Sequence, residues 1–298
     1  MTDTRKTHLD SLAVTCLVGC CFLWGLNQVA AKVALTEVPP LTQAAMRSVG
    51  GALLVWTFAS WRGMALFTRD GTLRGGLIAG ALFAAEFGCI FIGLQFTSAS
   101  RMAVFIYLSP FVVALGMPWI SKAERLSVLQ MAGLVIAFAG VAWAFAEGFT
   151  KPAVGAQQWL GDALGVLAGL LWGATTLAIR ATRLGQASPE KTLLYQLAIS
   201  GVLLAVAAGW KGTGLGVALA PLVVASLFFQ VVIVTFASYL VWFWLMRHYP
   251  ATKISSFSLL TPVFGLLLGA LLLAEPITAR LWVALASVST GIFLVNRR

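Results

Sequence analysis

Charged side chains are scarce in this sequence. They make up 10% of its 298 residues, whereas a soluble globular domain carries roughly 25%. Hydrophobic residues make up 60% and prolines number only 10, so the chain is neither a water-soluble globule nor a disordered or collagen-like polymer. The composition therefore predicts an integral membrane protein.

Cysteine and histidine are also rare, with four and two copies. Every cysteine lies in an apolar run, where it acts as a small packing residue, and no CxxC pair stands near a histidine. The sequence has no Walker loop and no HExxH or GxSxG motif. We therefore expect no metal, no cofactor, no direct use of ATP and no enzymatic activity.

Apolar runs of about 20 residues, the length of a membrane-spanning helix, follow one another along the chain. Ten spans are predicted in this way, at 11–31, 41–61, 75–96, 102–120, 127–146, 159–179, 192–210, 222–246, 254–273 and 278–295. Because the spans use most of the chain, no separate soluble domain is expected.

Basic residues outnumber acidic residues by 20 to 10. They fall singly or in small groups between the apolar runs, which favours a role in orienting the protein in the lipid bilayer over nucleic-acid binding. With a cytoplasmic N-terminus, 14 of them lie on the cytoplasmic side, five lie in the opposite loops, and Arg47 lies inside a span. The positive-inside rule therefore predicts that both termini are cytoplasmic.

Short sequence elements recur about 150 residues apart, in the same order along both halves. The recurring pairs are Trp24-Gly25 with Trp172-Gly173, Arg101 with Lys253, Pro110 with Pro262, and Glu124 with Glu275. This pattern predicts two repeats of five spans each, at 1–150 and 151–298. Because five is odd, the second repeat enters the membrane from the opposite side, and inverted repeats are typical of secondary transporters.

These residues, together with Ser98-Ala99-Ser100-Arg101, resemble the drug/metabolite transporter superfamily. The sequence is most similar to its EamA-type branch and, within that branch, to the YddG-type exporters of aromatic amino acids. The resemblance implies an all-α integral membrane protein with ten transmembrane helices as two inverted five-helix repeats. The cavity would lie among helices one to four and six to nine, with helices five and ten more peripheral.

The same resemblance implies a function. We expect export of small amphiphilic metabolites, above all aromatic and other neutral amino acids, across the bacterial inner membrane by alternating access. Cationic drugs, nucleosides or purines are alternative substrates of the same kind of exporter, and a passive channel is a further alternative. A channel predicts flux without saturation, whereas a transporter predicts saturable counterflow.

Two charged residues lie well inside predicted spans, Arg47 in the second and Glu86 in the third. At 1.5 Å per residue, Arg47 lies about 9 Å below the external face and Glu86 lies near the midplane. A zwitterionic amino acid needs an acceptor for its ammonium group and a donor for its carboxylate, which Glu86 and Arg47 would supply. Alternatively, Glu86 carries a coupling proton, the two residues form a structural ion pair, or Arg47 snorkels outward beside a protonated Glu86.

Polar and aromatic residues recur on one face of the first and sixth spans, at positions i, i+3 and i+4. They are Trp24, Asn27 and Gln28 in the first span and Trp172, Thr175 and Thr176 in the sixth. Further substrate-binding candidates are Tyr107, Tyr195, Gln196, Gln230, Ser238 and Tyr239. Rings and apolar walls with few polar anchors suit an aromatic substrate. Hydrogen bonding between helices is the alternative role for the polar candidates.

Pro110 and Pro262 stand at equivalent places in the fourth and ninth spans. A proline removes a backbone hydrogen bond and kinks a helix, so we expect paired gates or hinges there, or kinks that merely shape the bundle. In the sixth span a glycine recurs every four residues from Gly161 to Gly173. Such a strip predicts the close approach of a neighbouring helix.

Overall fold

The computed structural model describes residues 6–97, 99–144, 146, 155–210, 212, 220–272 and 279–297. Within this part of the chain almost every residue is helical and no strand is present. Six segments are long and apolar enough to cross a membrane, and shorter apolar helices accompany them. The protein is therefore an all-α membrane protein, as predicted.

The helices of the first half follow the predicted spans closely. They are α1 (Ser11–Ala34), α2 (Pro40–Trp61), α3 (Leu73–Gly93), α4 (Ala99–Ile106), α5 (Ser109–Ile120), η1 (Lys122–Glu124) and α6 (Val128–Ala144). The second half contains α8 (Gln158–Ala181), η2 (Arg183–Gln186), α9 (Pro189–Trp210), α10 (Pro221–Phe228), η3 (Phe229–Ser238), α11 (Tyr239–His248), α12 (Ala251–Phe257), α13 (Leu260–Leu272) and α14 (Ala279–Asn296). Taking α4 with α5, α10 with η3 and α11, and α12 with α13, these described helices form the ten predicted spans.

Three spans are not the single regular helices that the apolar runs predict. The chain breaks between α4 and α5 and again between α12 and α13, just before Pro110 and Pro262. Neither proline has an N–H group to continue the helical ladder, so the predicted kinks take the form of full breaks. In the eighth span, η3 is a π-helix, a form that often marks functional sites.

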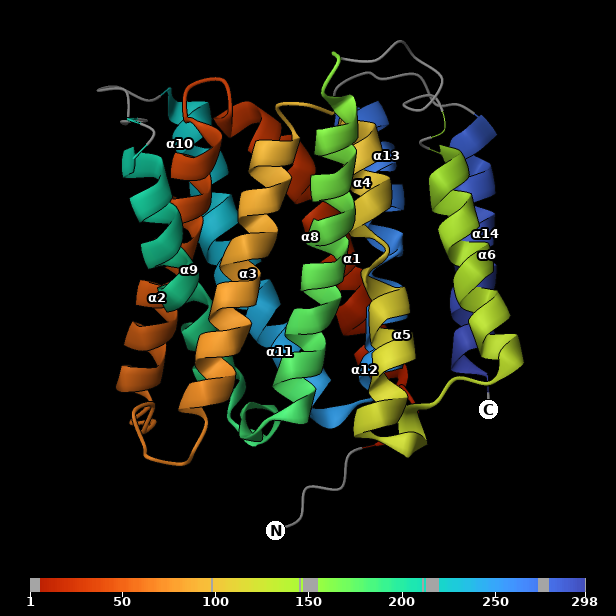
Figure 1. Ribbon diagram of the computed structural model, residues 1–298, viewed down its shortest axis with the longest axis horizontal. Coiled ribbons are helices and arrows are strands. Elements are labelled where there is room, and N and C mark those ends of the chain that lie inside the picture. The colour runs from red at the N-terminus through yellow and green to blue at the C-terminus, as the bar shows by residue number, and fades with distance from the viewer. Residues whose placement is uncertain are drawn as a thin grey trace.

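The two ends of the helix bundle differ in charge. The loops from α2 to α3, from α5 to α6, from α8 to α9 and from α11 to α12 lie at the end that also carries the N and C labels (Figure 1). Those loops and their short turns hold Arg62, Arg69, Lys122, Arg125 and Arg183, and Arg74 lies in the first turn of α3. We call this the basic end and the opposite end the far end.

Several contacts recur in matched form in the two halves. Ser200 of α9 donates a hydrogen bond of 3.0 Å to Ser48 of α2. The two serines are 152 residues apart, so they occupy equivalent positions in the two halves. At the far end Thr97 donates to Asp162 at 2.6 Å. At the basic end Tyr249, 152 residues after Thr97, donates to Asp10 at 2.8 Å. An inverted relation between the halves would produce such paired contacts at opposite ends.

The predicted glycine strip of α8 packs directly on neighbouring backbone. A Cβ atom on Gly169 would lie 2.5 Å from the Phe105 oxygen, and one on Gly161 would lie 2.7 Å from the Thr97 nitrogen. Only glycine allows this approach, which confirms the predicted close packing. On α1 the equivalent contact is a hydrogen bond of 3.2 Å from the Cys21 thiol to the oxygen of Phe257, 152 residues after Phe105.

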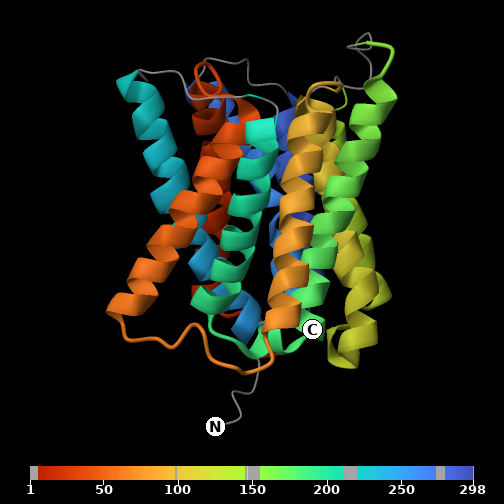
Figure 2. The ribbon, with the colours of Figure 1, turned by 60° about the vertical axis from the view of Figure 1, so that its left-hand side comes forward.

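Helices α6 and α14 pack on each other at the side of the bundle, where Gly133 and Gly291 bring the two backbones together (Figure 1). Figure 2 shows the orange α2 crossing the eighth span on one flank, where α2 contacts η3. The fifth and tenth spans are therefore peripheral, and the other eight surround the candidate site.

Candidate functional site

Aromatic side chains from α1, α3 and the eighth span meet in the middle of the bundle. The Trp24 ring lies 4.9 Å from that of Trp242 and 5.8 Å from that of Tyr239, centroid to centroid. Phe83 of α3 stands edge-on to Tyr239 at 6.4 Å. The Trp24 indole N–H donates to the Ser238 hydroxyl at 2.8 Å. Two predicted residues of the second half, Ser238 and Tyr239, thus meet Trp24 of the first half.

Arg47 and Glu86 are buried beside this aromatic cluster, with exposed fractions of 8% and 5%. The Arg47 Nη2 atom lies 3.4 Å from the Tyr239 hydroxyl, and its guanidinium lies 5.6 Å from the ring centre of Phe87. Tyr239 is within electrostatic range of both charged groups. Each residue keeps a buried atom without a hydrogen-bond partner, Nε of Arg47 and Oε2 of Glu86.

These two residues do not form the structural ion pair that was one alternative. No Arg47–Glu86 contact occurs among the ion pairs of the described residues. Neither does Arg47 snorkel outward, because its side chain turns to Tyr239 and Phe87 inside the bundle. Burying a charged group without full hydrogen bonding costs free energy. These two residues are therefore the best candidates for ligand-binding groups.

Tyr107 and Trp172 contribute a second pair of rings, 5.8 Å apart and edge to face. Tyr107 is 6% exposed, and it lies at the break between α4 and α5. It is also within electrostatic range of Tyr239, which places this pair near the first cluster. At the break in the fourth span, Tyr107 of the first half therefore meets Trp172 of the second half.

Gln230 belongs to a different polar group. It accepts a hydrogen bond of 2.7 Å from Gln43 and donates one of 3.4 Å to Ser226. Ser226 in turn donates to the Ala30 carbonyl oxygen. This chain links α2, the eighth span and α1, so the interhelical role predicted as the alternative for polar candidates accounts for Gln230.

The remaining candidates are spread more widely. Thr175 donates to the Leu171 carbonyl of its own helix at 2.8 Å, and the Tyr195 ring packs on Gly76 between α9 and α3. Gln28 is exposed and Thr176 is buried. Asn27 and Gln196 each keep a buried side-chain atom without a partner, Oδ1 and Nε2. Only these last two share the unsatisfied character of Arg47 and Glu86.

Three aromatic residues of the cluster are absent from the predicted set: Phe83, Phe87 and Trp242. Phe83 precedes Glu86 by three residues and Phe87 by four, so the shared face of α3 could have identified both phenylalanines. Trp242 follows Tyr239 by three residues and is equally readable. The many tryptophans expected at membrane interfaces hide such a residue in the sequence.

A second group of buried charges lies at the basic end. Glu124 pairs with Arg180, and both side chains are almost fully buried. Arg180 also donates to the Met246 oxygen at 2.8 Å, and the Thr252 N–H donates to Glu124 at 3.2 Å. The group therefore joins η1, α8, α11 and α12. Glu275, which matches Glu124 in the second repeat, lies outside the described residues.

Comparison with known proteins identifies the chain's relatives. The profile of the EamA-like transporter family matches residues 11–146 and again residues 159–297. A Bacillus subtilis protein named uncharacterized transporter YvbV is 28% identical over 93% of this chain and 88% of its own length. A probable amino-acid metabolite efflux pump of Escherichia coli is 24% identical over 91% of this chain and 90% of its own length.

The fold has a counterpart among solved structures. One crystal structure matches with a TM-score of 0.79 at 17% identity, covering 93% of this chain and 94% of that chain. Such a likeness concerns the fold. The two successive profile matches cover nearly all of the sequence, and they show that the chain belongs to the EamA-like transporter family.

Proposed function

We propose that this transporter exports small amphiphilic metabolites, above all aromatic and other neutral amino acids, across the bacterial inner membrane. Its two five-helix repeats, 1–150 and 151–298, would work by alternating access, with both termini in the cytoplasm. The matched contacts of the two halves and the concentration of basic loops at one end support this arrangement.

The observation that carries the substrate assignment is the pair of buried, incompletely bonded charges beside an aromatic cluster. Arg47 would donate hydrogen bonds to the substrate carboxylate and Glu86 would accept them from the ammonium group, with the Tyr239 hydroxyl beside Arg47. An aromatic side chain would pack against rings such as Trp24 and Phe83. A purely cationic drug fits less well, because Arg47 would repel it.

Glu86 has a second candidate role, that of a proton carrier. A buried carboxylate with one unpartnered oxygen changes its charge more readily than one held in an ion pair. The same residue would then bind substrate ammonium in one state and a proton in the other. This exchange would couple export to the proton gradient.

Saturable counterflow of labelled phenylalanine, tyrosine and tryptophan in proteoliposomes tests the proposal. We expect uptake into liposomes preloaded with unlabelled aromatic amino acid, competition by neutral amino acids and none by nucleosides or cationic drugs. Flux that rises linearly with concentration and shows no counterflow would instead indicate a channel. Competition by cationic drugs alone would move the assignment to another substrate class.

Glu86→Gln tests the site itself. We expect counterflow to fall at least roughly 100-fold, as for loss of a charged contact of about 2.7 kcal/mol, while expression and Tm stay unchanged. Glu190→Gln on α9 is the matched control, because that carboxyl lies in the first turn of α9 outside the cluster. Wild-type transport by Glu86→Gln would refute both roles of Glu86. Loss of proton-driven export with intact counterflow would favour the coupling role.

A further inference from the structure

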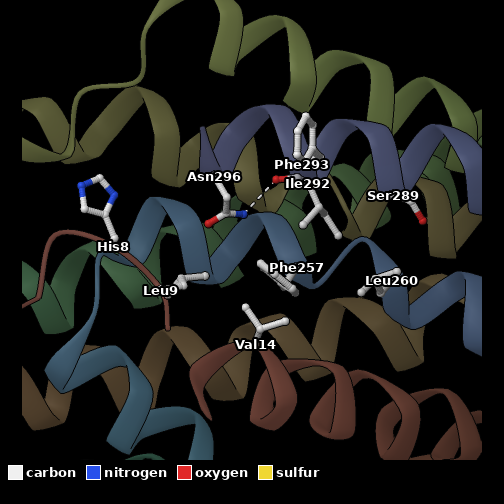
Figure 3. Close-up of a pocket in the computed structure, with 9 residues that line it drawn as sticks. All are labelled: His8, Leu9, Val14, Phe257, Leu260, Ser289, Ile292, Phe293 and Asn296. Atoms are coloured by element: carbon white, nitrogen blue, oxygen red, sulfur yellow. Dashed lines mark hydrogen bonds between the residues drawn. The ribbon is translucent and has the colours of Figure 1, made fainter. Parts of the chain in front are cut away.

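A cavity of about 390 Å³ opens between α1, the α12–α13 span and α14 near the basic end. Figure 3 shows its walls, which are mainly apolar, with Val14, Phe257, Leu260 and Ile292 facing one another. Along α14 the lining runs from Ser289 to Asn296, which corresponds to about 10 Å of helix. The volume lies within the range of small-molecule sites.

One end of this cavity is polar. His8 and Asn296 line it there (Figure 3). The Asn296 amide nitrogen donates to the Ile292 oxygen at 2.9 Å, which leaves its Oδ1 atom buried and without a partner. An acceptor in this position calls for a donor group that the described part of the protein does not supply.

Two cations flank the polar end. Lys253 is 7% exposed, and its ammonium group lies 3.2 Å from Nδ1 of His8. It precedes the lining residue Phe257 by one helical turn on the same face of α12. On α14, Arg297 follows Asn296, and its guanidinium lies 5.4 Å from the ring centre of the lining residue Phe293.

Lys253 differs from its counterpart in the other half. Arg101, 152 residues earlier, is paired with Asp162 at 2.9 Å and 2.5 Å. Among the described residues no carboxylate lies within ion-pair distance of the Lys253 ammonium. A buried cation without a carboxylate requires another source of negative charge.

We propose that this cavity binds one anionic phospholipid from the leaflet at the basic end. The phosphate would lie between Lys253 and Arg297, and a headgroup hydroxyl would donate to Oδ1 of Asn296. One acyl chain would run along Val14, Leu260 and Ile292 toward Ser289. Basic pockets between transmembrane helices that continue into an apolar groove have the chemistry of such lipid sites.

The side of the protein on which the cavity lies suits a lipid. Val14 and Phe293 are exposed, at 37% and 63%, so the groove opens sideways from the helix bundle rather than into its centre. It also borders α14, which belongs to the peripheral pair. Lipid bound there would connect that pair to α1 and α12 without entering the substrate path.

Lipid binding is tested on the purified full-length chain in a neutral detergent. Native mass spectrometry should show one phosphatidylglycerol retained per chain and little phosphatidylcholine. Phosphatidylglycerol at about 100 times its Kd should raise Tm by roughly 5 °C, and phosphatidylcholine should not. Equal effects of the two lipids would overturn the proposal. The same protection by glycerol phosphate or inorganic phosphate would show an anion site rather than a lipid site.

Two variants localise the effect. Lys253→Gln removes the buried cation, and Val14→Trp fills the groove while keeping every charge; each should abolish the difference between the two lipids. Arg74→Gln, an exposed basic residue at the same end, is the matched control and should retain it. An intact lipid preference in Val14→Trp would contradict the assignment even if Lys253→Gln fails to fold. A dimer that forms without lipid and is lost in Val14→Trp would assign the groove to a second copy of the chain instead.

Discussion

Among the buried charges of the described residues, the group at the basic end and the group at the centre have different surroundings. At the basic end Glu124 and Arg180 pair directly, and backbone groups of α11 and α12 add a hydrogen bond to each of them. At the centre Arg47 and Glu86 lie near the same tyrosine without pairing, and each keeps an unpartnered atom. The residue types are alike, so the difference comes from the surroundings that the helices provide.

This difference separates stability from function. Removing one member of a satisfied buried pair leaves the other uncompensated, which destabilises a protein strongly. Removing a charge that is already incompletely bonded relieves a cost and need not destabilise at all. The Glu124–Arg180 group should therefore hold the basic end together, whereas Arg47 and Glu86 should matter for transport.

Breaking the satisfied pair should have the largest effect on stability. Glu124→Gln leaves Arg180 without a carboxylate, and we expect the free energy of unfolding to fall by about 3–5 kcal/mol. Thermal unfolding in detergent measures this. Glu190→Gln is the control and should cost less than about 1 kcal/mol. An unchanged Tm in Glu124→Gln would remove the contrast between the two charge groups.

Arg47→Met tests the other side of the comparison. Methionine keeps much of the apolar volume that packs on Phe87 but cannot bind a carboxylate. We expect counterflow to fall roughly 100-fold, equivalent to about 2.7 kcal/mol, with Tm unchanged. A large fall in Tm with transport per folded molecule preserved would make Arg47 a structural residue.

Trp24→Phe should have a smaller effect. It keeps a ring against Tyr239 but removes the hydrogen bond from the indole N–H to Ser238. Loss of one such bond costs about 1 kcal/mol, and we expect KM to rise several-fold. Trp61→Phe, at a side chain that is 84% exposed, serves as the control. Identical kinetics of the two variants would place Trp24 outside the site.

The smallest effect concerns pH at the basic end. Hydrogen bonds from Lys6, the Ala13 N–H and Tyr249 lower the pKa of Asp10 from 3.8 to about 2. The stabilisation is therefore complete above pH 4 and disappears as the pH falls through 2. We expect Tm to decline more between pH 4 and pH 2 in the wild type than in Asp10→Asn. Parallel curves of Tm against pH would show that ionised Asp10 does not contribute to stability.

Much of the fold could be predicted from the sequence. Ten spans, a distortion of the helix at Pro110 and Pro262, and the glycine strip of α8 were all predictable, because each depends on local properties that a short window of sequence displays. That the two distortions are full breaks was not. The π-helical stretch of the eighth span was not predictable. That stretch packs on α2, where Val231 and Thr235 meet Gly50 and Gly51, and these are contacts between segments far apart in the sequence.

The candidate site was only partly predictable. Of the residues that the sequence singles out, Trp24 contacts Ser238 and Tyr239, and Tyr107 contacts Trp172. Tyr195 was equally plausible in sequence, yet its ring packs on Gly76. Helical spacing tells which residues share a face, but it does not tell which neighbour that face will meet.

The sequence by itself determined that this is a multi-pass membrane protein, because hydrophobic length and charge placement are additive properties of the chain. Its internal repeats, and not its composition, pointed to a transporter. It also singled out Arg47 and Glu86 as the two charges that topology does not need. Only the tertiary structure decided that these two remain unpaired while Glu124 and Arg180 pair. Pairing depends on distances between residues far apart in the chain, and only the packed helices set those distances.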